Sequence, residues 1–137
     1  MTREDAYGAL FTLLQTVPVK TRGRRLELLE EMDAPQLPAL FMTVGNQNIR
    51  DVEGAGPIRT LTAHVFVYAR NSDRHTPAGI QLNGLLDAIE AALAPTWGAQ
   101  TLGGEVQHAW IEGEIEVFEL PQGEKAAAIV PIKILMP

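Results

Sequence analysis

The chain has 137 residues, contains no cysteine, and carries a formal net charge of −6 from 17 acidic and 11 basic side chains. That length is sufficient for a hydrophobic core without metals or disulfides, and it predicts a single domain over residues 1–137. The missing cysteine excludes a disulfide framework, a thiolate zinc site and a cysteine nucleophile, while the net negative charge argues against general affinity for nucleic acid.

The charges are unevenly distributed along the chain. Residues 1–74 hold nine basic and nine acidic side chains, whereas residues 75–137 hold two and eight. The two halves could therefore attract each other between subunits. The N-terminus carries acids where a signal peptide would be basic, and no apolar run is long enough to span a bilayer, so we expect a soluble protein with no membrane partner.

The first predicted element is a helix over residues 2–17. Thr2 can cap this helix with Asp5 in the reciprocal position of a capping box, and Pro18 ends it. The expected buried stripe consists of Ala6, Leu10, Leu13, Leu14 and Val17. The segment 26–32 is ambiguous: its alternation of Leu with charged residues favours a strand with a bulge, while its Leu and Glu content leaves a short helix open.

Two strands are expected in the middle of the chain. Residues 39–44 predict a short buried strand, and residues 58–69 a longer one with one apolar face and one mixed face. The polar stretch 46–56, with two glycines and Pro57 at its end, predicts a long hairpin connection. Residues 39–49 should therefore pair antiparallel with residues 58–69.

A second helix and two further strands complete the prediction. Thr76 is a good N-cap with Pro77 at the first helical position, and Leu82, Leu85, Leu86, Ile89 and Leu93 form an apolar stripe. Residues 105–120 predict a long strand and residues 126–136 its hairpin partner, which should lie at an edge or bulge at Pro131 because proline cannot donate to a ladder. The fold class is α+β, a mixed, mostly antiparallel sheet of about four to five strands with two main helices packed against it.

Three carboxylates form the most specific pattern in the chain. If residues 105–120 are one strand, Glu112, Glu114 and Glu116 share one face, about 6.5–7 Å apart. A solvated sheet face accounts for them; alternatively they form an acidic wall that lines a channel or faces the basic cluster of a neighbouring subunit. A metal site is disfavoured, because no loop with calcium-binding spacing supplies further oxygen ligands.

The basic cluster consists of Lys20, Arg22, Arg24 and Arg25. It could contact phosphates, but it has no interleaved aromatic residues and the chain is acidic overall, so a solvated or subunit-facing segment is favoured. Of the two tryptophans, Trp97 and Trp110, at least one should lie in the core, and either could anchor an interface.

No pattern predicts catalysis or a cofactor. Ser72, Asp73 and His75 carry the atoms of a hydrolase triad, but triads are normally assembled from separate elements. His64 and His108 lack metal-ligand spacing, and the glycines at 54–56 and 102–104 complete neither a dinucleotide-binding nor a P-loop pattern. We therefore expect a protein that is not an enzyme and that holds no metal or cofactor.

Short motifs over most of the chain follow one another in a distinctive order. They are Pro38-Ala39-Leu40-Phe41, Val67-Tyr68, Leu82-Asn83-Gly84-Leu85-Leu86-Asp87-Ala88-Ile89, Thr101-Leu102-Gly103-Gly104, Ile111 with Gly113, and Pro131-Ile132. In this order they resemble small tail proteins of long-tailed bacteriophages and prophages, and the group they resemble most is the tail terminator or tail-completion proteins.

The resemblance implies a ring, usually six-fold, that caps the head-proximal end of the tail tube. Such a ring stops polymerisation of the tube protein and docks onto the head–tail connector, and DNA passes through it without specific binding. The protein would be made in the cytoplasm of the bacterial host and end in the virion tail. Glu112, Glu114 and Glu116 would be candidates for the lumen wall, and Lys20, Arg22, Arg24 and Arg25 for subunit or connector contacts.

Other roles remain open beside the terminator. A neck or connector adaptor and a tail-tube subunit also use small sheet-plus-helix ring subunits, so the fold does not decide among them. A small DNA-binding module is a further alternative, and it predicts salt-sensitive DNA binding that is lost when Arg22, Arg24 and Arg25 become Ala.

Overall fold

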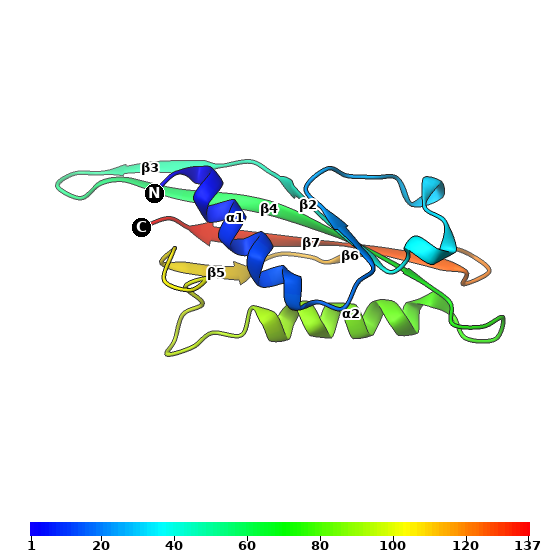
Figure 1. The fold of residues 1–137 in the computed structure, drawn as a ribbon. Coiled ribbons are helices and arrows are strands. Elements are labelled where there is room, and N and C mark those ends of the chain that lie inside the picture. The colour runs from blue at the N-terminus through cyan, green and yellow to red at the C-terminus, as the bar shows by residue number, and fades with distance from the viewer.

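A computed structural model describes all residues 1–137, and it places two helices on one face of a seven-stranded sheet (Figure 1). The helices are α1 (Arg3–Leu13) and α2 (Ala78–Ala92). The strands are β1 (Thr21–Gly23), β2 (Ala39–Val44), β3 (Asn48–Val52), β4 (Gly56–Arg70), β5 (His108–Ile111), β6 (Glu116–Glu119) and β7 (Lys125–Leu135). The α+β class is confirmed, although the sheet has more strands than the four to five expected.

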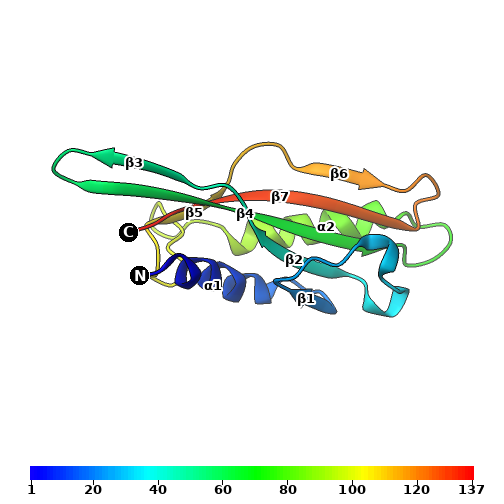
Figure 2. The same ribbon diagram turned by 90° about the horizontal axis from the view of Figure 1, so that it is seen from above.

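The sheet has the order β1-β2-β4-β7-β5, with β4 and β7 at its centre. β3 continues along β4 on the side of β2, and β6 continues along β7 on the side of β5. All pairs are antiparallel except β1 with β2, so the sheet is mixed and mostly antiparallel as predicted. The β3–β4 hairpin extends beyond the helices, and the two chain termini lie near its base (Figures 1 and 2).

The main core lies between the sheet and the two helices. Leu61, Ala63, Val65 and Val67 of β4 are fully buried there, as the period-two pattern predicts. The first helix begins with the predicted capping box, in which the backbone N–H of Asp5 donates to Thr2 Oγ1 over 3.0 Å and that of Thr2 donates to Asp5 Oδ2 over 2.9 Å. Its buried residues Ala6, Tyr7 and Leu10 face the sheet.

A second, smaller core covers part of the opposite face of the sheet. It consists of Met32, Leu37, Ala39, Phe41, Tyr68 and Ala127. The segment 26–37 crosses this face as irregular chain with two short 3-10 turns, Leu29–Glu31 and Ala34–Gln36. The expectation of a strand at 26–32 is therefore wrong, because Leu29 and Met32 pack over the sheet face instead of pairing with its edge.

Two short strands were not predicted. Residues 21–23 pair in parallel with β2, and residues 48–52 pair with the start of β4, so most of the expected loop 46–56 is a β-hairpin. Between β2 and β3, residues 45–47 lie opposite only residues 61 and 62 of β4, which is a bulge of one residue. The predicted antiparallel pairing of 39–49 with 58–69 holds on either side of this bulge.

The predicted strand 105–120 is two strands with an interruption at residues 112–115. These four residues lie opposite only residues 130 and 131 of β7, and Gly113 has a φ of 103°. The backbone N–H of Glu112 donates to the carbonyl of Pro131, so the side of Pro131 that lacks an N–H faces the interruption. The expectation for Pro131 is corrected: β7 is a central strand, and it is the neighbouring strand that bulges.

The start of the second helix also differs in detail. The helix begins at Ala78 with Pro77 at the N-cap, whereas the Thr76 hydroxyl donates to Asp73 Oδ2 over 3.1 Å. Thr76 therefore belongs to the preceding turn and does not cap the helix. The predicted stripe is buried at Leu82, Leu85, Ile89 and Leu93.

Candidate assembly surface

The basic cluster lies at one edge of the sheet. Residues 21–23 form β1, whose only neighbour is β2, and the backbone N–H of Lys20 donates to the carbonyl of Pro38 over 2.8 Å. The short edge strand is thereby fixed to the loop that precedes β2. Lys20 and Arg25 at the ends of the cluster are exposed.

The two inner arginines of the cluster bind within the chain. Both terminal guanidinium nitrogens of Arg24, Nη1 and Nη2, donate to the Glu4 carboxylate, over 2.7 and 3.1 Å, and the Arg24 Cζ lies 5.9 Å from the centre of the Tyr7 ring. The Arg24 hydrogen bond lowers the pKa of Glu4. Arg22 donates to the carbonyl of Val17, and its Nε is buried without a partner. Lys20 and Arg25 therefore remain free for an external contact, while Arg24 secures α1 to the cluster.

The acidic residues lie at the other edge of the sheet, but they do not form the predicted row. Glu112 and Glu114 lie in the interruption between β5 and β6, and Glu116 begins β6 opposite Ile129. Glu112 accepts a hydrogen bond from Trp110 Nε1 over 3.3 Å. All three carboxylates are exposed, and none takes part in an ion pair, because the pair between Glu4 and Arg24 is the only one in the chain.

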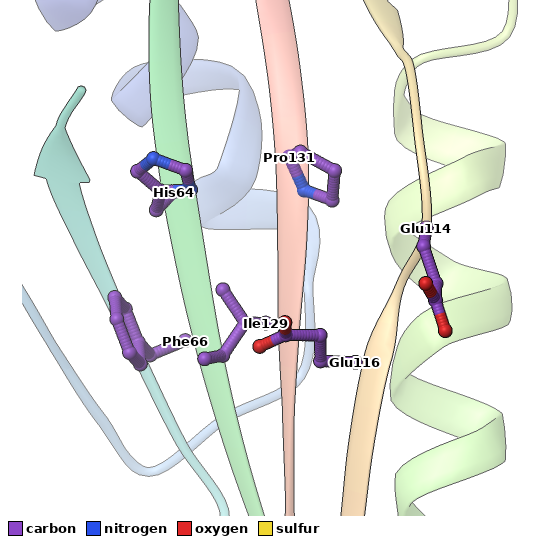
Figure 3. Close-up of a pocket in the computed structure, with 6 residues that line it drawn as sticks. All are labelled: His64, Phe66, Glu114, Glu116, Ile129 and Pro131. Atoms are coloured by element: carbon purple, nitrogen blue, oxygen red, sulfur yellow. The ribbon is translucent and has the colours of Figure 1, made fainter. Parts of the chain in front are cut away.

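Two of these carboxylates border a shallow pocket on the sheet face opposite the helices. The pocket has a volume of about 330 Å³ and is lined by His64, Phe66, Glu114, Glu116, Ile129 and Pro131. In Figure 3, Glu116 extends over β7 toward Ile129, whereas Glu114, in the stretch between β5 and β6, lies farther from β7. The sequence pattern indicated this surface only indirectly, through the mixed face of residues 58–69.

The same face carries further paired side chains. Lys133 Nζ donates to Thr62 Oγ1 over 2.7 Å, and the His108 and Trp110 rings stack with centroids 5.0 Å apart. Trp110 is only partly buried and Trp97 is 99% exposed, so the expectation that one tryptophan lies in the core is wrong. Trp97 lies in the turn between Thr96 and Ala99, with a φ of 56°.

The possible triad residues are held in a turn. The Asp73 carboxylate accepts hydrogen bonds from the backbone N–H groups of His75 and Thr76, which lower its pKa. Its oxygens thus stabilise the turn before α2 and do not orient a histidine ring. His64 lies on β4 and His108 on β5, and no group of three or more His, Asp or Glu side chains is arranged to hold a metal ion.

Apolar side chains are exposed at both edges of the sheet. Val117 and Phe118 of β6 are each 55% exposed, and Val44 of β2 and Ile49 of β3 are exposed along the other edge. Edge strands with unpaired backbone groups and apolar side chains are sites of association unless they are covered. Neither helix of the chain is long and apolar enough to cross a membrane.

Comparison with known proteins gives a structural match but no sequence match. No protein-family model matches the sequence, and no curated protein matches it. Among solved structures, the fold is shared with a chain of a structure described as the virion of a native gene transfer agent (GTA) particle. The likeness has a TM-score of 0.51 at 8% sequence identity, and it covers 95% of this chain and 90% of that one.

Proposed function

We propose that this chain is a structural protein of a phage-like virion. The observation that carries this proposal is the fold shared with a chain of a GTA virion particle over nearly the whole length of both chains. The order of sequence motifs, which resembles small phage tail proteins, supports the same class independently of the coordinates. The role is structural and not enzymatic, and the separation of the histidines and the use of Asp73 within its turn agree with that role.

Within that class we propose the role of a tail terminator. The protein would form a ring, six-fold in the expected case, at the head-proximal end of the tail tube, where it ends polymerisation of the tube protein and joins the tail to the head–tail connector. DNA would pass through without specific binding. Two open sheet edges on one subunit support a ring, because contacts between two different surfaces of identical subunits close into rings or extend into filaments.

The ring itself is tested by light scattering of the purified protein across concentration, followed by negative-stain imaging of the largest species. A terminator should give a closed ring with a central hole, or a monomer that added tail tubes capture at one end. Growth into open-ended tubes would identify a tail-tube subunit instead. A monomer that tail tubes do not capture, but that isolated connectors bind, would identify a neck adaptor.

A second measurement separates this role from DNA binding. Titration of the protein with duplex DNA at low and high salt should give no binding beyond that of an acidic control protein of similar net charge. Strong binding that weakens with salt and is lost when Lys20 and Arg25 become Ala would favour the DNA-binding module and would contradict the terminator role.

A further inference from the structure

The two free edges of the sheet lie at the same level along the strands. The pairing register connects Arg22 of β1 through the central strands to Val117 of β6. The three rows across the sheet are Thr21, Ala39, Tyr68, Ala127 and Phe118; Arg22, Leu40, Val67, Ala128 and Val117; and Gly23, Phe41, Phe66, Ile129 and Glu116. Figure 2 shows β6 and β1 on opposite sides of the strands that connect them.

The directions of the two edge strands suit them for pairing. β1 runs parallel to β2, and the three following pairs, β2–β4, β4–β7 and β7–β6, are antiparallel. β6 therefore runs opposite to β1. When two copies stand side by side in the same orientation, as in a ring, β6 of one copy meets β1 of the next as an antiparallel pair.

The charges at the two edges are opposite and are also at matching levels. The basic edge holds no acid from residue 20 to residue 25, and the acidic edge holds no Lys or Arg from residue 105 to residue 124. Residues 24 and 25 come directly after β1, and residues 112–115 come directly before β6. Because β1 and β6 run in opposite directions, both segments lie at the same end of the two edges, level with Pro131. Contact of either edge with its own copy would bring like charges together, whereas contact between the two edges brings opposite charges together.

We propose that subunits of the ring associate edge to edge, with β6 of one copy adding to β1 of the next. Arg25 of the neighbouring copy then lies near Glu114, and Lys20 lies level with Glu119. Glu116 lies between them opposite Gly23, and Val117 and Phe118 are covered in the contact. This proposal rests on the proposed ring for its symmetry, and it assigns the acidic residues to the subunit interface in place of the lumen wall.

Charge-swap variants test the contact. E114K/E116K places two lysines against the basic edge, and K20E/R25E places two glutamates against the acidic edge, so neither variant should form rings alone. An equimolar mixture should form alternating rings, and a single chain with all four substitutions should assemble again. D87K/E90K changes the charge by the same amount as E114K/E116K on exposed α2 positions, and it should assemble like the wild type. Arg24 is left unchanged because it holds Glu4.

Assembly is read by light scattering and negative stain, with circular dichroism to establish that each variant is folded. Ring formation by E114K/E116K or K20E/R25E at wild-type levels would overturn the edge contact and leave the terminator role standing. Failure of the folded four-substitution chain to assemble would overturn it as well.

Engineered cysteines test the contact when the free wild-type protein stays monomeric. The chain has no cysteine, and same-level pairing places Thr21 of one copy opposite Phe118 of the next. A mixture of T21C and F118C should form cross-linked dimers under mild oxidation several-fold faster than a mixture of T21C and N83C, which carries its second cysteine on the exposed side of α2. Equal rates would overturn the proposal. Selective cross-linking by a protein that never caps tail tubes would retain the contact and reject the terminator role.

Discussion

At the scale of single residues, Asp73 shows how a polar group that resembles catalytic machinery can be structural. Its carboxylate accepts hydrogen bonds from His75 and Thr76, and its pKa is lowered from the ordinary value of 3.8. A carboxylate with a lowered pKa in the folded state adds stability above its unfolded pKa, and this stability is lost as the pH falls through the lower, folded value.

We therefore expect Asp73→Asn to lower the stability at neutral pH and to have little effect in strong acid. Urea unfolding of the wild type and the variant should give midpoints that differ at pH 7 and converge as the pH falls below about 3.8, the ordinary pKa of this carboxyl. A difference that stays constant from pH 7 to pH 2.5 would show that the lost bonds do not depend on the charge.

Two glycines give opposite predictions for the same substitution. An added Cβ at Gly84 in α2 meets no atom within 4 Å, so Gly84→Ala should raise the free energy of unfolding by about 0.5–1 kcal/mol through helix propensity. Gly123 has a φ of 70°, and its added Cβ would lie 3.2 Å from Pro77 Cβ, so Gly123→Ala should lower it by about 1–2 kcal/mol. Urea unfolding measures both changes in free energy. Changes of the same sign and size in the two variants would contradict the explanation from backbone conformation.

At the scale of elements, the irregular segment 26–37 stabilises the fold although it has little regular structure. Leu37 is fully buried against the second core, the Tyr68 hydroxyl donates to the Glu27 carbonyl over 2.8 Å, and Lys125 Nζ donates to the Met32 carbonyl over 2.9 Å. The segment is thus joined to both central strands, which carry Tyr68 and Lys125.

Leu37→Ala should accordingly lower the free energy of unfolding by about 2–5 kcal/mol, because it leaves a cavity in a core of only six buried residues. Leu28→Ala is the matched control, because it removes the same side chain nine residues earlier at an exposed position. It should lower the free energy of unfolding much less. Comparable losses in chemical denaturation would mean that the segment does not pack as described.

The elements that were predicted correctly have strong local patterns. The α1 capping box, the alternation along β4 and the apolar stripe of α2 are each encoded by neighbouring residues. β1 and β3 were missed because Thr21-Arg22-Gly23 and Asn48-Ile49-Arg50-Asp51-Val52 have no apolar alternation, and both depend on pairing with β2 or β4. The predicted 105–120 strand is interrupted at Gly113, opposite Pro131 of β7. The regular alternation of carboxylates in the sequence hides this interruption.

The two charged clusters can be recognised in the sequence, but their arrangement in space cannot. The sequence identifies an acidic and a basic cluster of opposite charge, and the structure places them at opposite edges of one sheet. Their matching level could not be predicted, because it follows from the register of four successive strand pairs. The ion pair between Arg24 and Glu4 depends on where α1 packs, which also cannot be predicted from the sequence.

At the scale of the whole molecule, the charge difference between the edges makes assembly sensitive to salt. The Debye length falls from about 10 Å at 0.1 M salt to about 3 Å at 1 M, so the attraction between exposed edges should weaken. We expect the concentration at which wild-type subunits associate to rise several-fold over this range when followed by light scattering. Association that strengthens with salt would indicate an interface dominated by apolar contacts.

The position of the termini at one end of the strands has a consequence for the assembled particle. In a ring whose subunits stand edge to edge in the same orientation, the same end of every subunit's sheet lies on the same rim of the ring. One rim would carry all the β3–β4 hairpins and both termini of every subunit, and the other rim would carry the turns at residues 71–77 and 120–124 (Figure 1). The ring would therefore have two different mouths, so a gold label on either terminus would reveal in electron micrographs which mouth meets the tube.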